Sequence, residues 1–165
     1  FNLNKLLEEL HRDYRGASRA VHFELRPAVE DEKAWIISDE QRLKRILQIL
    51  LDNAFKFTPE GKVNLGYSLR KDVIQLHVSD TGQGIPESAQ DKVFKQFTQG
   101  DMKFDREHEG TGIGLSIALQ IAENLEGKLW FNSTEGEGTT FYVEVPYAKS
   151  QRERLPGWLK SVFSK

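Results

Sequence analysis

With 165 residues, 38% of them hydrophobic and 29% charged, the chain is large enough for one globular domain with a substantial core. Its formal net charge of −2 disfavours a general nucleic-acid binder, which needs clustered Lys and Arg. It has no cysteine, and its histidines lack metal-ligand spacing, which excludes thiolate chemistry and zinc ligation by cysteine.

No apolar run approaches the roughly 18 residues of a membrane span, and no signal peptide is visible, so we expect no direct membrane contact. The first residue is Phe1 rather than Met, which favours a piece of a longer protein.

Apolar periodicity in the first half of the chain predicts alternating helices and strands. Leucines at helical spacing indicate an amphipathic helix over residues 2–18. A longer helix is expected to begin at Ser38-Asp39, with Gln41 completing a capping box, and to stop at Pro59. The strands predicted in this half are 21–25, 34–37, 62–69 and 73–79.

The second half begins with a short predicted helix over 87–93 and a polar stretch, 96–109, without periodicity. A third main helix over 114–125 is expected to end in a left-handed cap at Glu126-Gly127. Strands over 128–133 and 139–146 then form a hairpin.

One candidate for ligand chemistry is Asp80, at the end of a predicted strand and followed by Gly82 and Gly84. An acid before two glycines is common in turns, so one interpretation is purely structural. The other is a carboxylate aimed at a hydrogen-bond donor on a ligand, with glycine backbone that a flat group can approach.

A second glycine cluster, Gly110-Thr111-Gly112-Ile113-Gly114-Leu115, opens a predicted helix, where backbone N–H groups and the helix dipole favour phosphate. It is not the dinucleotide-binding fingerprint, because a polar loop rather than a strand precedes it, and it is not a Walker A loop, because no Gly-Lys-Ser/Thr follows.

Two further segments are weak signals when taken alone. Asn53 and Lys56 lie beside the apolar stripe of their helix, where an amide oxygen could ligate Mg²⁺ and an ammonium could neutralise a phosphate. The alternative is ordinary polar residues at a helix end. The segment 136–141 reads as a hairpin turn.

The order of these motifs is specific. The chain reads L-x-D-N-A-x-K-F-T, D-T-G-Q-G-I, F-K-Q-F, G-T-G-I-G-L-S-I and G-E-G-T-T-F. It resembles the catalytic, ATP-binding domain of sensor histidine kinases, in the wider class that includes gyrase, MutL and the large heat-shock ATPase. The resemblance covers residues 1–147 and leaves 148–165 as a C-terminal tail or linker.

The resemblance implies a two-layer α/β sandwich, with a mixed, mainly antiparallel sheet, helices on one face and a mobile ATP lid. It implies ATP and Mg²⁺ as cofactors. The γ-phosphoryl group would pass to a histidine on dimerisation helices that this chain does not contain, and then to the receiver domain of a response regulator. The domain would be cytoplasmic, and the sequence leaves open whether the parent protein is anchored in a membrane.

The resemblance also implies roles for individual residues. Asp80 would accept a hydrogen bond from the adenine amino group, with a water shared by Thr139 or Thr140. Asn53 would ligate Mg²⁺ and Lys56 would contact phosphate. The remaining implied contacts are Gly82, Gly84 and Ile85 at the base; Gly110, Thr111, Gly112, Ile113, Gly114 and Leu115 at the phosphates; Phe94 and Phe97 as tethers of the lid; and Lys103, Arg106 or His108 at the γ-phosphate.

Three positions depart from the family pattern. Ile49 stands where members usually carry Asn or Glu, and Glu109 stands where a further glycine is common. His11 lacks the flanking residues of a phosphoacceptor and is expected to be an exposed helix residue. Ile49 leaves two interpretations open: a core residue, or a site position at which Asn would raise phosphoryl transfer. A catalytically weak, nucleotide-binding regulatory module that signals through the lid is therefore the alternative function.

Overall fold

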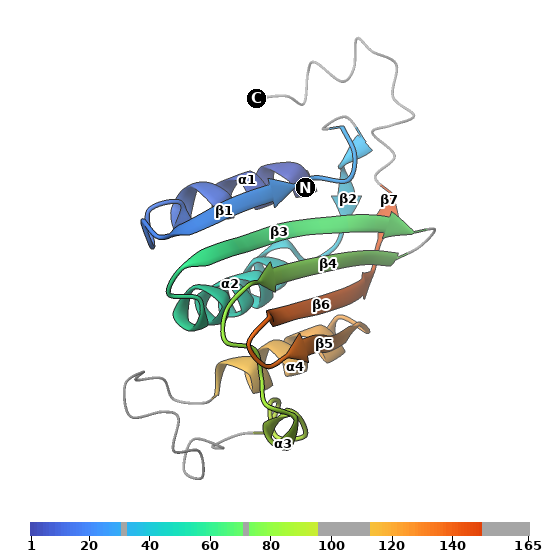
Figure 1. The fold of residues 1–165 in the computed structure, drawn as a ribbon. Coiled ribbons are helices and arrows are strands. Elements are labelled where there is room, and N and C mark those ends of the chain that lie inside the picture. Colours follow the sequence, from blue (N-terminus) through green and yellow to red (C-terminus); the bar gives the residue numbers. More distant parts are fainter. Residues whose placement is uncertain (31–32, 71–72, 96–112, 150–165) are drawn as a thin grey trace.

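A computed structural model describes residues 1–30, 33–70, 73–95 and 113–149. Its main feature is a five-stranded sheet in the order β1-β3-β4-β6-β5 (Figure 1). Within it, β1 and β3 pair in parallel and the other neighbours pair antiparallel. The strands are β1 (Val21–Arg26), β3 (Gly61–Arg70), β4 (Val73–Asp80), β5 (Lys128–Thr134) and β6 (Gly138–Pro146).

The helices α1 (Leu3–Tyr14), α2 (Glu40–Phe57) and α4 (Gly114–Asn124) cover one face of this sheet (Figure 1). The strands show the same asymmetry, because alternate residues of β4 are buried and the residues between them are only half-buried. A short helix, α3 (Glu87–Gln90), follows β4. The predicted two-layer α/β sandwich with a mainly antiparallel sheet is confirmed.

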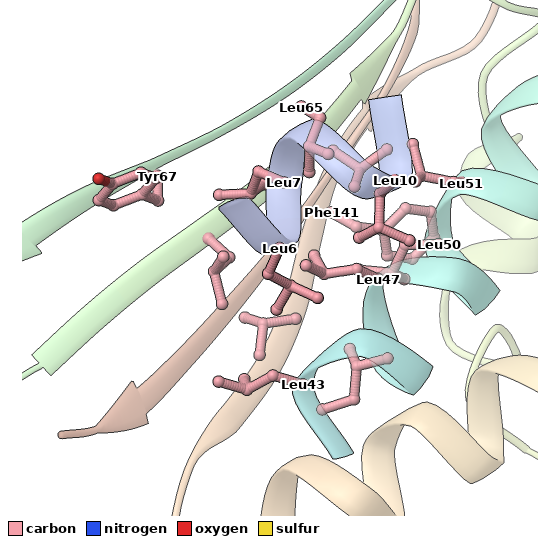
Figure 2. Close-up of a cluster of buried hydrophobic side chains, with 14 of the residues drawn as sticks. Leu6, Leu7, Leu10, Leu43, Leu47, Leu50, Leu51, Leu65, Tyr67 and Phe141 are labelled. Carbon is pink, nitrogen blue, oxygen red and sulfur yellow. The ribbon is translucent and has the colours of Figure 1, made fainter. Parts of the chain in front are cut away.

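The core lies between this helical layer and the sheet. Leucines at helical spacing on α1 and α2 point toward each other and toward the strands, and each fully buried leucine contributes roughly 1.5–3 kcal/mol of transfer free energy. Figure 2 shows them together with their partners on the sheet: Leu6, Leu7, Leu10, Leu43, Leu47, Leu50, Leu51, Leu65, Tyr67 and Phe141.

Of two predicted helix ends, one is wrong in detail and the other is confirmed. The N-cap of α2 is Asp39, whose side chain accepts a hydrogen bond from Arg42 N, so the capping box expected on Ser38 does not form. The left-handed cap expected at Glu126-Gly127 is present, with the positive φ on Glu126 (57°). Gly127 is needed for another reason: a Cβ there would lie 2.3 Å from the backbone oxygen of Glu144.

A second, two-stranded sheet pairs β2 (Ile36–Ile37) antiparallel with β7 (Ala148–Lys149). Phe1 joins it, because its amino group donates to the Ile36 oxygen (3.0 Å) and its own oxygen accepts from Ile36 N (3.0 Å). No sequence pattern predicted β7, which begins beyond the expected domain end at 147. Residues 150–165 of the expected tail lie outside the described part. None of the described helices is long and apolar enough to cross a membrane.

Candidate functional site

Three of the sequence motifs meet at one end of the sheet, although they are far apart in the chain. They are the C-terminal turn of α2, the loop that follows β4, and the turn between β5 and β6. Gln83 in the β4 loop joins the other two segments: its N–H donates to the Phe57 oxygen (3.2 Å), and its oxygen accepts from Gly136 N (2.7 Å). The site is therefore assembled around the loop after Asp80.

Asp80 ends β4 with its side chain on the buried, helix-covered face, where it is 9% exposed. Its Oδ1 accepts hydrogen bonds from the N–H of Gly82 (2.9 Å) and of Thr139 (3.2 Å). Burial raises the pKa of this carboxyl above its ordinary value, and the hydrogen bonds oppose that rise. Oδ2 accepts no hydrogen bond from the residues that the structure describes, so a donor on a ligand can use it.

The strand register places Thr139 and Thr140 on opposite faces of the sheet. Thr140 pairs with Ser79 on the sheet face away from the helices, and their hydroxyl oxygens lie 2.9 Å apart. Thr139 is on the same face as Asp80 and is 6% exposed. Of the two threonines that the sequence left open, Thr139 is therefore the one placed beside the carboxylate.

Ser133 on β5 is a site residue that sequence reasoning missed. Its hydroxyl accepts from Ile85 N (2.8 Å), donates to the Gly138 oxygen (3.0 Å) and lies 2.9 Å from Thr139 Oγ1. It thus fastens the β4 loop to the β5–β6 hairpin. A serine within a strand pattern carries no local signal for this, because the contact depends on the hairpin register.

Gly82 and Gly84 are required by packing within the chain itself. A Cβ on Gly82 would lie 2.2 Å from the Phe57 oxygen. Gly84 has φ 68°, and a Cβ there would lie 2.1 Å from the Thr134 oxygen. The two glycines let the β4 loop fit between the α2 end and the β5–β6 hairpin, whatever a ligand does at the same backbone.

Asn53 and Lys56 lie on the last turns of α2 and are half-buried. Asn53 Nδ2 donates to the backbone oxygen of Ile49 (2.9 Å). Because a carbonyl can only accept, this bond assigns the amide nitrogen and turns Oδ1 away from the helix backbone. Lys56 Nζ lies 4.9 Å from the ring centroid of Phe57.

An outward amide oxygen beside an ammonium fits a hydrated Mg²⁺ and a phosphate, because Mg²⁺ takes few protein ligands and keeps several waters. Among the described residues, no group of three or more His, Cys, Asp or Glu side chains could hold a metal ion. A Mg²⁺ at this position would therefore need the phosphate as a further ligand.

Ile49 is 5% exposed and belongs to the core. Its Cγ2 lies 3.4 Å from the position of a Cβ on Gly114, so the face of α2 that carries Asn53 lies next to the start of α4. No side chain caps α4 at Ile113, and the Ser116 hydroxyl donates to the Ile113 oxygen instead (2.7 Å). The described residues therefore place no side-chain cap on the first-turn N–H groups of α4, and such groups can bind an anion.

Several predicted contacts fall outside the described residues: Phe97, Gly110, Thr111, Gly112 and the candidate γ-phosphate contacts Lys103, Arg106 and His108. Phe94, just before that segment, is described. Its ring lies 5.7 Å from the ring of Phe131 and 6.4 Å from that of Phe141, so it packs on β5 and β6.

His11 differs from its expected exposure. It is half-buried: Nε2 lies 3.0 Å from the Phe23 oxygen, and its ring lies 4.7 Å from the Phe23 ring. The reason is that β1 lies alongside this face of α1, which the helix pattern alone did not show.

Comparison with known proteins agrees with this geometry. The family described as histidine kinase-, DNA gyrase B-, and HSP90-like ATPase matches residues 38–149. LuxQ of Vibrio vulnificus, named as an autoinducer 2 sensor kinase/phosphatase, is 35% identical over 161 residues, which is 93% of this chain and 19% of LuxQ. The chain thus spans about a fifth of the curated relatives that it matches.

Solved structures show the same fold. ShkA in complex with AMPPNP superposes with a TM-score of 0.78 at 26% identity, covering 91% of this chain and 31% of ShkA. The catalytic domain of histidine kinase ThkA superposes with a TM-score of 0.74 at 30% identity, covering 88% of this chain and 95% of that domain. The chain belongs to the histidine kinase-, DNA gyrase B- and HSP90-like ATPase family, as a catalytic domain of the sensor histidine kinase type.

Proposed function

We propose that this chain binds ATP together with Mg²⁺ and delivers the γ-phosphoryl group to a histidine on dimerisation helices outside the chain. The observation that carries the proposal is the Asp80 carboxylate, buried where three motifs meet, with Oδ1 held by two backbone N–H groups and Oδ2 left for a ligand. The ShkA structure with AMPPNP supports nucleotide binding by this fold.

In this proposal each described side chain has a positional role. Asp80 Oδ2 accepts from the adenine amino group, and Thr139 lines the pocket beside it. Asn53 Oδ1 provides an oxygen for Mg²⁺, and Lys56 balances phosphate charge. The phosphates lie at the start of α4, at Ile113, Gly114 and Leu115, together with Gly110, Thr111 and Gly112 before it.

The chemistry asked of this chain is positioning and charge neutralisation. A bound Mg²⁺ supplies further charge neutralisation at the phosphate oxygens. The unprotonated imidazole nitrogen attacks the γ-phosphorus, the bond to the bridging oxygen breaks, and ADP leaves. The proton on the other imidazole nitrogen then passes to water or to a base outside this chain. A neutral imidazole is already a nucleophile, so this chain needs no general base.

The second substrate of the proposed pathway is an aspartate on a receiver domain. The ThkA relative supports this step, because its structure was solved in complex with the response regulator protein TrrA. We therefore propose as partners the dimerisation helices of the same protein and a receiver domain. We also propose a cytoplasmic location for this domain, because ATP is supplied there.

One observation favours a second candidate, a catalytically weak regulatory module that signals through nucleotide binding. Ile49 is buried at the position where the family pattern has Asn or Glu, so no polar side chain there can order a water or assist a metal. Both candidates predict nucleotide binding, and they differ in phosphoryl transfer.

Titration calorimetry with ATP, GTP and Mg²⁺ tests the binding. We expect GTP to bind roughly ten- to a hundredfold more weakly than ATP, because guanine presents an oxygen to the Asp80 carboxylate. Equal affinities would contradict the base site. Transfer from [γ-³²P]ATP in a longer protein that carries the dimerisation helices then separates the kinase from the regulatory module.

The chain alone is expected not to autophosphorylate, because its acceptor histidine lies elsewhere. His11→Gln is the control. Acid-labile label on the parent chain that is lost in this variant would show that His11 is an acceptor.

A further inference from the structure

Thr58, the residue that caps the C-terminus of α2, has a buried hydroxyl that the fold does not use. The residue is 0% exposed, and its Oγ1 makes no hydrogen bond to any residue that the structure describes. Buried hydroxyls are normally paired, so an unpaired one calls for an explanation in function or in a missing partner. None of the roles proposed above involves this group.

The hydroxyl lies against the loop that holds Asp80. A Cβ on Gly82 would lie 2.7 Å from Thr58 Oγ1, and the N–H of Gly82 is one of the two donors to Asp80 Oδ1. A hydrogen bond from this hydroxyl would lower the pKa of the Asp80 carboxyl by stabilising its charged form. The methyl group has a separate, structural contact: Cγ2 lies 3.7 Å from the Cβ position of Gly61.

The oxygens of Asp80 restrict where this hydroxyl can bond. Oδ1 already accepts two hydrogen bonds, from Gly82 N and Thr139 N, whereas Oδ2 accepts none from the described chain. A carboxylate offers about two acceptor positions on each oxygen. Oδ2 can therefore take one bond from a ligand and one from Thr58, which completes the acceptor set of the carboxylate.

We infer that Thr58 is a positioning residue of the base pocket: its hydroxyl donates to Asp80 Oδ2 and holds that oxygen toward the amino group of the bound base. The inference rests on the proposed ATP site. It makes Thr58 a determinant of base affinity and of the pH at which binding fails, although Thr58 does not touch the base.

A difference in pH dependence between two variants of Thr58 is attributable to Asp80, because the terminal phosphate of ATP, which also titrates at about pH 6, is common to both titrations. No ionised side chain of the described segments is among the causes that shift the pKa of Asp80. Burial and the hydrogen-bond donors are the causes. The charged residues on the neighbouring segments do not contribute to that pKa: Lys56 on α2, Glu60 and Lys62 at the start of β3, and Glu135 and Glu137 in the β5–β6 turn.

The test compares Thr58→Val, which keeps the shape and the methyl contact, with Thr58→Ser, which keeps the hydroxyl. ATP binding to the 165-residue chain with Mg²⁺ is titrated between pH 5 and 8. At pH 7 we expect Thr58→Val to bind about tenfold more weakly and Thr58→Ser to stay within about threefold of the parent. The acid loss of binding should begin about one pH unit higher in Thr58→Val.

A purely structural role predicts a different pattern. Thr58→Val keeps the buried shape, so a role in packing alone would leave ATP affinity unchanged. Loss of the bond to Asp80 weakens ATP binding and lowers stability at pH 7 by about 1 kcal/mol. In an Asp80→Asn background the same change should have no further effect on affinity, since the acceptor charge is gone. Parent-like binding by Thr58→Val, or equal weakening in Thr58→Ser, would overturn the inference.

The two proposals fail separately. If the parent chain binds no ATP, the proposed function fails, and the carboxyl titration of Asp80, followed by ¹³C NMR in the ligand-free chain, decides the role of Thr58. A higher titration midpoint in Thr58→Val than in Thr58→Ser supports it, and equal midpoints refute it.

Discussion

The side-chain amide of Asn53 donates a 2.9 Å hydrogen bond to the backbone oxygen of Ile49, one turn earlier on α2. This bond fixes which end of the amide faces the helix, and so presents Oδ1 at the edge of the site. The same turn carries the apolar side chain of Ile49 into the core. On this face of α2, Asn53 therefore presents a polar group to the site, and Ile49 packs in the core.

The Asn53 amide leads to a prediction about Mg²⁺. In Asn53→Ala, ATP titrated without Mg²⁺ should bind as in the parent chain, whereas the gain in affinity on adding Mg²⁺ should be reduced about tenfold or more. Titration calorimetry with and without EDTA measures both quantities. An equal loss under both conditions would assign Asn53 to the nucleotide or to the fold instead of the metal.

The burial of Ile49 favours the packing interpretation of that position. Ile49→Asn would bury an amide without partners and should lower the free energy of unfolding by roughly 1–3 kcal/mol. The control Ile49→Val should cost only about 0.5–1.5 kcal/mol. Denaturation and the transfer rate are measured on the same variants, and a stable Ile49→Asn protein with faster transfer would restore the catalytic interpretation.

Thr139 and Thr140 form a natural matched pair. Each hydroxyl has a hydroxyl partner 2.9 Å away, but only Thr139 shares the face of Asp80. Thr139→Val should weaken ATP binding by about five- to tenfold, and Thr140→Val should leave it within about twofold. Titration calorimetry of both variants decides, and a larger effect of Thr140→Val would mean that the base lies on the other face of the sheet.

The raised pKa of Asp80 predicts how stability depends on pH. Its native pKa lies above the ordinary value of 3.8, so ionising this carboxyl costs more in the folded state than in the unfolded state. Asp80→Asn should therefore be more stable than the parent chain at pH 7. The difference should shrink as the pH falls through the native pKa and vanish below about 3.8.

Urea denaturation at several pH values measures this difference. The exposed Asp13 provides the control, and Asp13→Asn should change stability by less than about 0.5 kcal/mol. A stability difference for Asp80→Asn that stays constant down to pH 3 would show that ionisation of Asp80 is not its cause.

Alanine substitutions at Gly84 and Gly136 distinguish the cost of a positive φ from the cost of a steric clash. Both have positive φ, 68° and 81°, but only a Cβ on Gly84 would collide with the chain, 2.1 Å from the Thr134 oxygen. Gly136→Ala should cost about 1–2 kcal/mol of stability. Gly84→Ala should cost more and also weaken ATP binding, and equal costs on urea denaturation would mean that the β4 loop can shift without loss.

The sequence by itself predicted most of the elements, because these depend on local patterns: leucine spacing places the core face of α2, and strand alternation places Asp80 on the buried side of β4. The sheet class and the roles of the site residues came from the resemblance to sensor histidine kinases. The order of the motifs then indicated the family, which the comparisons show.

Only the tertiary structure decided the contacts between distant segments. The β4–β6 register placed Thr139 rather than Thr140 on the face of Asp80, and the hairpin brought Ser133 to Ile85. The packing of α2 on the β4 loop left the Thr58 hydroxyl against Gly82. Such contacts depend on strand register and packing, and a shift of one residue in either strand would exchange the faces. No local pattern in the sequence contains that information.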